Sequence, residues 1–422
     1  MRMNLWNETK SIPISRQMIW EAYKKVRANK GSAGIDEVSM ESFDTYHQKY
    51  LYKLWNRMSS GSYFPPAVKE VEIPKRDGKV RKLGIPTILD RVGQMVIKMY
   101  IEPRLEILFS NNSYGYRPGK NAHQALAKVR ENCWNYDWVI DLDIKGFFDN
   151  IDHDKLLLAI DIHVSEKWVI LYIKRWLTAP VKTASGILKT NQGKGTPQGG
   201  VISPLLANLY LHYAFDRWLE KTDKDIQYCR YADDIIVHCN TKSHADNLLR
   251  LIQDRLASTG LELHPEKTKI VYCKDYRRKG NHKTVKFDFL GYSFQPRSAQ
   301  SKKNGNLFLG YDCAISISSR KQLGNKLREM QIGKFTCNSI VGIAHRLNPV
   351  IRGWISYYGR YKMYELTKVF RLLSCRLVWW ARKRYKRYKT NLRKAYQWLA
   401  RVRRQYPSLF YHWQFSQINV IA

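Results

Sequence analysis

The chain has 422 residues, 44% of them hydrophobic, and it contains no run of about 18 uncharged apolar residues. Lysines and arginines number 72 and aspartates and glutamates 36, so the formal net charge is +36. This composition excludes a membrane-spanning helix and allows two or three globular domains. It favours a polyanionic partner, because a strongly positive field attracts phosphate polymers.

Cysteine usage and the first residues indicate a protein kept inside the cell. The seven cysteines form no C-x-x-C pair, so no zinc site is expected, and no apolar stretch of signal-peptide length opens the chain. The 27 tyrosines, 14 phenylalanines and 13 tryptophans are interleaved with the cations. That mixture favours nucleic acid over a membrane surface, because aromatic rings stack on unpaired bases.

Hydrophobic periodicity predicts a mixture of helices and strands. Helices are expected over 15–29, 39–58 and 89–109, and strands over 68–73, 80–85, 138–144 and, as a strand–turn–strand, 226–239. Ser15 and Gly31 are expected to bound the first helix, and Asp77-Gly78 to form the turn between the first two strands. From about residue 320 the pattern is mostly helical. The sequence therefore predicts an α+β protein.

Two carboxylates share one face of the strand predicted over 138–144. Alternate residues of a strand point the same way, so Asp141 and Asp143 lie side by side among apolar neighbours. Desolvation and like-charge repulsion would oppose ionisation of both unless a cation is bound. Asp141 could equally be a supporting acid or the structural partner of a nearby lysine.

A second pair of carboxylates, Asp233 and Asp234, stands between two apolar, strand-like runs. Neighbouring strand residues face opposite ways, so only a tight turn lets both approach one site. Turns favour aspartate for ordinary reasons, so this pair alone is weak evidence. Together with Asp143 it would form an oxygen-rich cluster that suits Mg²⁺.

The stretch 371–410 contains 13 lysines and arginines and no acidic residue. Its densest part, here called the basic tail cluster, consists of Arg382, Lys383, Arg384, Lys386 and Arg387. A charge run is often only a solvated face. Here tryptophans and tyrosines lie among the cations, so the cluster is predicted to bind RNA.

Several motifs in fixed order resemble those of reverse transcriptases. Tyr231-Ala232-Asp233-Asp234 resembles the active-site tetrapeptide of that family, and the segment from Asp143 to Asp149 resembles its first carboxylate motif. The other matching segments are 195–208, 260–268 and 289–292. Flanking segments resemble group II intron reverse transcriptases and their maturase, or thumb, domain; these are 29–36, 83–87, 113–119 and 347–358. The resemblance covers nearly the whole chain.

The resemblance implies a right-hand polymerase with fingers, an antiparallel-sheet palm and a mostly helical C-terminal thumb. The expected domains are an N-terminal helical extension (1–60), fingers and palm (61–295), a thumb or maturase domain (296–395) and a tail (396–422). The implied function is copying of intron RNA into DNA by target-primed synthesis, with assistance to splicing, in the bacterial cytosol. Intron RNA, a DNA primer or target and deoxynucleoside triphosphates would be the partners.

The resemblance also assigns roles to single residues. Asp143, Asp233 and Asp234 would hold two Mg²⁺ ions, which the backbone of Ile144 would also approach. Five residues would serve the incoming nucleotide and the leaving group: Lys75 and Arg81 on the triphosphate, Phe148 under the sugar, Gln198 at the pocket edge and Lys267 as a possible general acid. Lys75 and Arg81 could instead be solvated hairpin charges, and either Phe147 or Phe148 could belong to the core.

One departure and two alternatives accompany this interpretation. Many relatives continue into a Cys/His-bearing endonuclease, for which no motif is found before residue 422, so DNA cleavage by this chain alone is not expected. The same polymerase could be domesticated for antiviral defence or spacer acquisition. The chain could also be a non-catalytic RNA-binding splicing factor, although the three intact aspartates argue against that.

Overall fold

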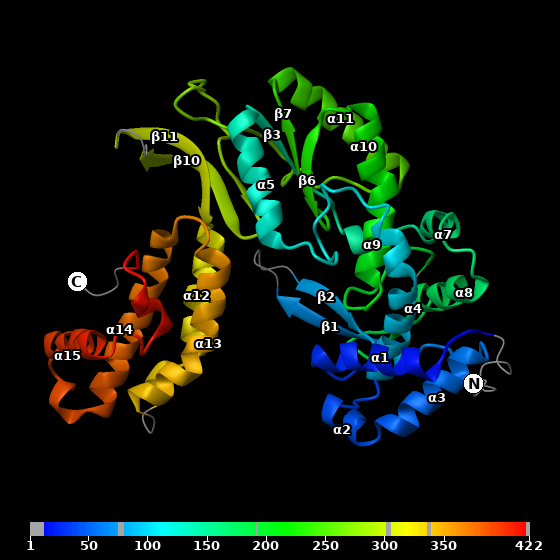
Figure 1. The fold of residues 1–422 in the computed structure, drawn as a ribbon, viewed down its shortest axis with the longest axis horizontal. Coiled ribbons are helices and arrows are strands. Elements are labelled where there is room, and N and C mark those ends of the chain that lie inside the picture. The colour runs from blue at the N-terminus through cyan, green and yellow to red at the C-terminus, as the bar shows by residue number, and fades with distance from the viewer. Residues whose placement is uncertain (1–11, 75–79, 191, 301–304, 336–338, 419–422) are drawn as a thin grey trace, which may run out of the picture. The chain divides into compact units, whose positions relative to one another are not determined.

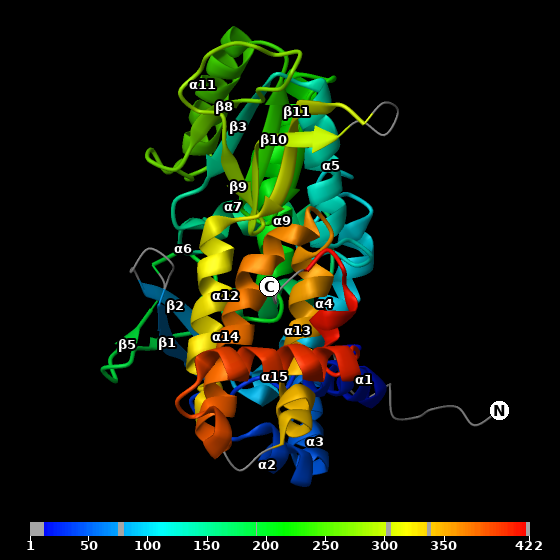
Figure 2. The same ribbon diagram turned by 90° about the vertical axis from the view of Figure 1, so that its left-hand side faces the viewer.

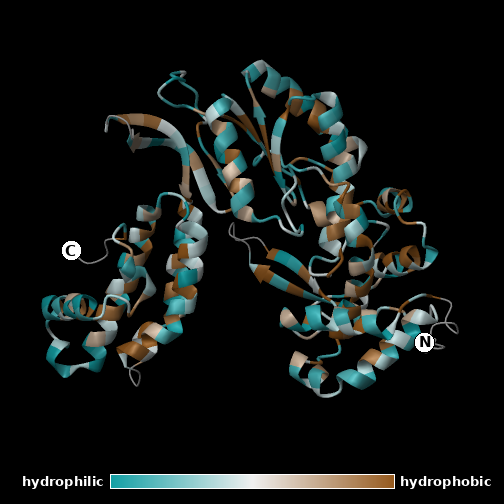
Figure 3. Cartoon of the chain, in the orientation of Figure 1, coloured by the Kyte–Doolittle hydropathy of each residue, from teal (hydrophilic) through white to brown (hydrophobic). Residues whose placement is uncertain are grey.

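The computed structural model describes residues 12–74, 80–190, 192–300, 305–335 and 339–418 (Figure 1). The chain divides into two compact units. Unit 1 comprises Met1–Ala125 and Ile140–Ile270, and unit 2 comprises Leu126–Val139 and Val271–Ala422. Brown and teal segments alternate along the helices of both units in Figure 3, as expected for amphipathic helices with one buried face. Within the described ranges no helix combines the length and apolar character needed to cross a membrane.

Unit 1 begins with three helices, α1 (Arg16–Ala28), α2 (Met40–Thr45) and α3 (His47–Ser59). The Ser15 hydroxyl caps α1 by accepting a hydrogen bond from the Met18 amide at 3.2 Å, as predicted. The expected end at Gly31 is wrong, because Asn29 ends the helix and Lys30 takes the left-handed conformation (φ 44°). The single helix expected over 39–58 is two helices, because the backbone leaves the helical region at Tyr46.

A four-stranded sheet follows, with strand order β2-β1-β4-β5. The predicted hairpin is confirmed: β1 (Val68–Pro74) and β2 (Val80–Ile85) pair antiparallel, from Lys69 opposite Ile85 to Pro74 opposite Val80. β4 (Val181–Lys182) runs parallel to β1 and pairs with β5 (Leu188–Lys189). The predicted turn at Asp77-Gly78 lies outside the described residues.

The central sheet has strand order β6-β7-β3-β8. Its strands are β3 (Trp138–Asp143), β6 (Gln227–Tyr231), β7 (Asp234–Cys239) and β8 (Lys269–Tyr272). The strands predicted over 138–144 and 226–239 are therefore confirmed. The accompanying helices are α4 (Ile88–Glu106), α5 (Ala122–Asn135), α6 (Phe147–Asn150), α7 (His153–Asp161), α8 (Lys167–Leu177), α9 (Ser203–Leu211), α10 (Arg217–Thr222) and α11 (Lys242–Ser258). A π-helical turn, His212–Asp216, joins α9 to α10.

Unit 2 combines a three-stranded antiparallel sheet with helices (Figure 2). The strands are β9 (Phe287–Phe289), β10 (Tyr292–Gln300) and β11 (Leu307–Ile315), and the helices are α12 (Ile317–Glu329), α13 (Ile340–Tyr358), α14 (Thr367–Arg384) and α15 (Leu392–Gln405). Short 3₁₀ turns cover Ile332–Lys334, Met363–Leu366, Lys386–Tyr388 and Tyr411–Gln414. The helical character predicted from about 320 is confirmed. The boundaries expected at 295 and 395 stay predictions, and α15 runs across the second of them.

Candidate active site

The turn between β6 and β7 presents two aspartates. Tyr231 pairs with Asp234 across the hairpin, which leaves only Ala232 and Asp233 in the turn. Ala232 takes a left-handed conformation (φ 57°), unusual for a residue with a Cβ. The tight hairpin expected around Asp233 and Asp234 is thus present, with Asp233 at the tip and Asp234 at the start of β7.

Asp143 stands at the end of β3, the strand next to β7 in the sheet. The Asp143 carbonyl accepts a hydrogen bond from the His264 amide at 2.7 Å, and the Asp143 amide donates to the Thr268 hydroxyl at 3.4 Å. The Lys267 ammonium lies 2.7 Å from a carboxylate oxygen of Asp143. The segment 260–268 therefore folds over the end of β3 and places a cation on its last carboxylate.

The charges of the three aspartates act on one another, which indicates that they lie in one site. Desolvation by the surrounding protein atoms, together with the charges of Asp233, Asp141 and Asp143, raises the pKa of Asp234 to about 7, although the side chain is exposed on one side. Burial, and then Asp143, also raises the pKa of Asp233. Asp141 lies 3.5 Å from the Lys269 ammonium, consistent with a lysine-paired structural acid. Mutual repulsion between the carboxylates is the conflict that the sequence predicted.

The chemistry of this donor set fits a hard divalent cation. Carboxylate oxygens are the ligands that such ions prefer, and a cation would offset the desolvation and the repulsion that raise the pKa of Asp234. Within the described part of the chain, no three acidic, histidine or cysteine side chains already surround a common point as metal ligands. Asp143 is paired instead with the ammonium of Lys267, which supplies positive charge at the same carboxylate.

The structure brings two of the predicted nucleotide-binding residues together. The Arg81 Nε donates to the Gln198 side-chain oxygen at 2.7 Å, and the Gly84 amide donates to the Gln198 carbonyl at 2.8 Å. Gly199 makes this approach possible, because it has φ 124° and a Cβ there would lie 2.4 Å from the Gly84 oxygen. The Arg81 charge also lowers the pKa of Asp233, so the hairpin and the carboxylate turn are neighbours.

For the other predicted nucleotide-binding residues in the described ranges, the structure shows burial and backbone contacts. Phe147 and Phe148 are both buried, with 2% and 8% exposed, and their rings meet edge to face at 5.3 Å. The Phe148 carbonyl accepts a hydrogen bond from the Thr196 amide at 2.8 Å, which ties it to the loop that contains Gln198. Ile144 is buried and forms a bridge with Leu263. Lys75 lies outside the described residues.

A buried ion pair behind the carboxylate turn was not predicted from the sequence. Arg230 and Asp216 are both fully buried and form two hydrogen bonds, of 2.9 and 2.5 Å. The Arg230 guanidinium also donates to the Asn208 side-chain oxygen at 2.9 Å and to the Ala232 carbonyl at 3.1 Å. Arg230 therefore holds the turn that carries Asp233. The signal in the sequence was a single arginine inside an apolar strand.

The segment 113–119 braces the same turn. The Tyr114 amide donates to the Arg230 carbonyl and the Arg230 amide donates to the Asn112 carbonyl, both at 2.8 Å. The Asn208 amide group donates to the Gly115 carbonyl at 2.8 Å. A Cβ at Gly115 would lie 2.4 Å from the Ala232 nitrogen, so only glycine fits there. This glycine lets the loop pack directly against the backbone beside Asp233.

The basic tail cluster lies at the end of α14 in unit 2. Lys383, Arg384, Lys386 and Arg387 are exposed, whereas Arg382 is half-buried and donates to the Lys389 carbonyl at 2.8 and 3.2 Å. The aromatic side chains expected to stack on RNA are largely core: Trp380, Tyr388 and Trp398 are at most 9% exposed. Trp379 and Tyr406, each 54% exposed, are open to solvent.

Comparison with known families agrees with this fold. A family model described as reverse transcriptase (RNA-dependent DNA polymerase) matches residues 73–294, more than half of the chain. The chain therefore belongs to the reverse transcriptase family, whose members have a right-hand polymerase fold and use divalent metal ions. A second model, the group II intron maturase-specific domain, matches residues 320–398. Both domains imply nucleic-acid partners.

Curated relatives are intron-encoded proteins in the main. The chain is 34% identical over 192 residues to the group II intron-encoded protein LtrA of Lactococcus lactis subsp. cremoris, covering 45% of this chain and 32% of LtrA. It is 31% identical over 294 residues to protein YkfC of Escherichia coli K12, covering 60% of this chain and 77% of YkfC. It is 27% identical over 231 residues to nuclear intron maturase 2, mitochondrial, of Arabidopsis thaliana, covering 46% and 30%. The alignments thus span about a third of LtrA and of the maturase. The predicted resemblance to group II intron reverse transcriptases is confirmed.

Proposed function

We propose that this protein is an RNA-directed DNA polymerase that copies intron RNA into DNA from a target-DNA primer, in the bacterial cytosol, and assists the splicing of that RNA. The observation that supports the polymerase proposal is the shared site of Asp143, Asp233 and Asp234, in which desolvation and the neighbouring carboxylates together raise the pKa of Asp234 to about 7. The proposed domains are an N-terminal extension (1–60), fingers and palm (61–295), a thumb or maturase domain (296–395) and a tail (396–422).

The three aspartates would hold two Mg²⁺ ions. When bound, the ions supply positive charge that activates the primer 3′-hydroxyl and stabilises the pyrophosphate leaving group. Lys267, which pairs with Asp143 at 2.7 Å, is a candidate proton donor to pyrophosphate. Its ammonium would exchange the Asp143 carboxylate for the anionic pyrophosphate and then give it a proton, which leaves the lysine as a neutral amine.

The remaining residues would bind and select the nucleotide. Arg81 and Lys75 would contact the triphosphate, because charged donors bind multiply anionic groups best. Gln198, held by Arg81 at 2.7 Å, would border the base and sugar, and the backbone of Ile144 would lie beside the metal and the triphosphate. Phe148, tied to the same loop, would exclude a ribose 2′-hydroxyl by its bulk.

Primer extension on an RNA template tests the polymerase proposal. Asp143→Ala and Asp233→Ala should abolish extension while RNA affinity stays at the wild-type value, because binding depends on distributed cations. Asp254→Ala, which removes an exposed carboxylate from α11, is the matched control and should extend normally. Extension by either active-site variant at a rate near that of the control would refute the metal assignment.

A splicing assay separates the maturase role from polymerisation. The Asp233→Ala protein should still stimulate splicing of its intron RNA at moderate Mg²⁺, because the proposed RNA contacts, including the basic tail cluster, lie elsewhere. Loss of splicing in this variant, with RNA binding intact, would mean that the two roles share the carboxylate site. Equal splicing with and without the wild-type protein would exclude a maturase role.

A further inference from the structure

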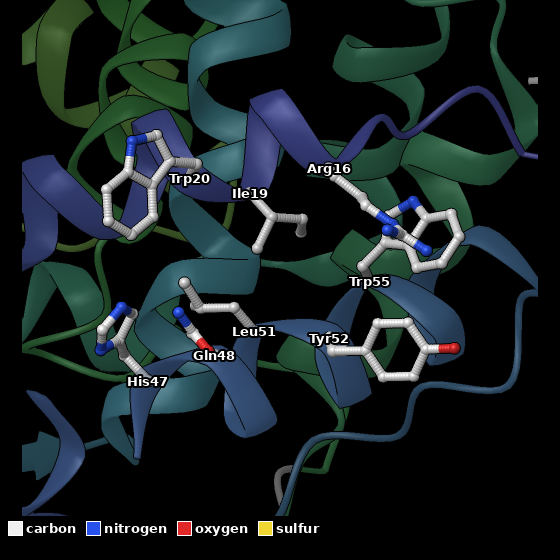
Figure 4. A pocket seen from close by; sticks show the side chains of 8 residues that line it. All are labelled: Arg16, Ile19, Trp20, His47, Gln48, Leu51, Tyr52 and Trp55. Atoms are coloured by element: carbon white, nitrogen blue, oxygen red, sulfur yellow. The ribbon is translucent and has the colours of Figure 1, made fainter. Parts of the chain in front are cut away.

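A pocket of about 360 Å³ lies between α1 and α3 in unit 1 (Figure 4). The pocket is mainly aromatic and aliphatic, with a few polar groups, and it is lined by Arg16, Ile19, Trp20, His47, Gln48, Leu51, Tyr52 and Trp55. Its volume is at the lower end of the range for small-ligand sites. None of the motifs assigned to polymerisation contributes to it, so it is separate from the carboxylate site.

Two large aromatic side chains at this pocket are open to solvent. Trp20 is 40% and Tyr52 55% exposed, whereas Ile19, Leu51 and Trp55 are buried beneath them. Figure 4 shows Trp20 and His47 at one end of the pocket and Tyr52 at the other. Exposed rings around one apolar hollow leave aromatic faces hydrated, so a flat ligand that covers them would be stabilised by stacking.

The polar groups at the pocket favour an anionic ligand with hydrogen-bonding edges. The Arg16 guanidinium lies 4.3 Å from the centre of the Trp55 ring and 5.3 Å from that of Tyr52. The pocket therefore contains a cation beside its aromatic rings. α3 also carries Lys49, Lys53 and Arg57, which are exposed and do not line the pocket, and it has no acidic residue. An amide, Gln48, adds both a donor and an acceptor.

We infer that this pocket binds one unpaired nucleotide of the RNA held by the protein. The base stacks on Trp20 and Tyr52, and Arg16 and the lysines of α3 contact the flanking phosphates. A nucleic-acid duplex would not fit, because its base faces are covered by neighbouring pairs. The row of cations on α3 favours RNA over an apolar protein helix. The inference rests on the proposed function only for the source of the RNA.

Binding of short RNAs tests this pocket. A single-stranded RNA and a duplex that contains the same strand are titrated against the wild-type chain and the Trp20→Ala/Tyr52→Ala variant. Affinity for the single strand should fall about 5- to 150-fold, as expected for loss of stacking on one base, while affinity for the duplex should not change. The slope of affinity against salt should stay constant for this variant, because no phosphate contact is removed.

Matched controls exclude unfolding and general charge effects. Tyr46→Ala removes a ring that is 59% exposed in the same segment but lies outside the pocket, and it should bind as wild type. Lys49→Ala/Lys53→Ala should weaken binding and reduce the salt slope. A 4-thiouridine placed in the single strand should cross-link to the peptide that contains Trp20 or Tyr52, which locates the base without any mutation.

The results separate this inference from the polymerase proposal. Unchanged single-strand affinity in the Trp20→Ala/Tyr52→Ala variant, or an equal loss for the duplex, would overturn the pocket assignment even if Asp233→Ala abolishes extension. Loss of single-strand affinity together with cross-links at the pocket would establish the site even if no variant extends primers. Cross-links confined to other peptides would also overturn it.

Discussion

Replacing Arg230 by methionine should disconnect the carboxylate turn from its support. Arg230 and Asp216 are both 0% exposed, so removal of the guanidinium leaves a buried carboxylate without its partner. Breaking a buried pair in this way costs about 3–5 kcal/mol. At about 2–4 °C per kcal/mol for a domain of about 150–250 residues, the unfolding temperature should fall by about 6–20 °C.

The rate of primer extension by Arg230→Met should fall by more than the loss of stability explains. Arg230 donates to the Ala232 carbonyl at 3.1 Å, so its loss frees the turn that carries Asp233. A displacement of about 1 Å in a catalytic group costs about 100-fold in rate. Extension measured below the lowered unfolding temperature should therefore fall about 100-fold, with RNA affinity unchanged.

A second variant separates positioning from stability. Asp216→Leu together with Arg230→Met removes both charges, which should recover part of the lost stability, because a buried apolar pair is tolerated better than a lone charge. It should not recover extension, since Ala232 still lacks its donor. Arg104→Met, which breaks a partly exposed ion pair with Glu166 of 2.8 Å, is the control and should cost at most about 1 kcal/mol. Wild-type extension by the double variant would refute the positioning role.

Three further predictions concern the site, the basic tail cluster and Asp90, a buried residue of α4. Phe148→Ala should raise the efficiency of ribonucleotide over deoxynucleotide incorporation in primer extension, and an unchanged ratio would make Phe147 the first alternative. Alanine at the exposed members of the basic tail cluster should weaken RNA binding and flatten its salt dependence in a filter-binding assay, whereas Arg382→Ala should mainly lower the unfolding temperature, because Arg382 bonds the Lys389 carbonyl. Burial raises the pKa of Asp90 to about 6, above about 3.9 in an unfolded chain, so the folded state alone holds a proton between these values. Asp90 alone should thus lower the free energy of unfolding by about 3 kcal/mol as the pH rises from about 4 to about 6, and urea titrations should show this contribution as the difference between the pH profiles of wild type and Asp90→Asn.

Local patterns explain why much of the site could be predicted. Asp143 and the Asp233–Asp234 turn follow from strand alternation and from a hairpin short enough to face both aspartates toward one place. Arg81 and Gln198, which the resemblance assigned to the nucleotide from motifs 117 residues apart, are hydrogen-bonded to each other, and their role stays a prediction. For the aspartates a short segment determines the local geometry, so the sequence nearby contains the necessary information, whereas Arg81 and Gln198 were linked only by the resemblance.

Tertiary packing decided the features that the sequence did not reveal. Trp380, Tyr388 and Trp398 lie among cations in the chain, yet they are buried because the helices of unit 2 close over them. Hydropathy alone cannot tell such a tryptophan from one that faces RNA. The first helix likewise ends before Gly31, because Lys30 accepts the left-handed conformation that glycine was expected to supply.

The π turn between α9 and α10 explains how two side chains of one continuous helical segment can both bond Arg230. Asn208 and Asp216 both bond the Arg230 guanidinium although they are eight residues apart. At about 100° per residue, eight residues of a regular α-helix leave the two side chains about 80° apart around the axis. The π turn His212–Asp216 absorbs one extra residue, so the effective separation is seven residues and the offset falls to about 20°. Asn208 and Asp216 can then face the same arginine, and the inserted residue is what completes the support behind the Asp233 turn.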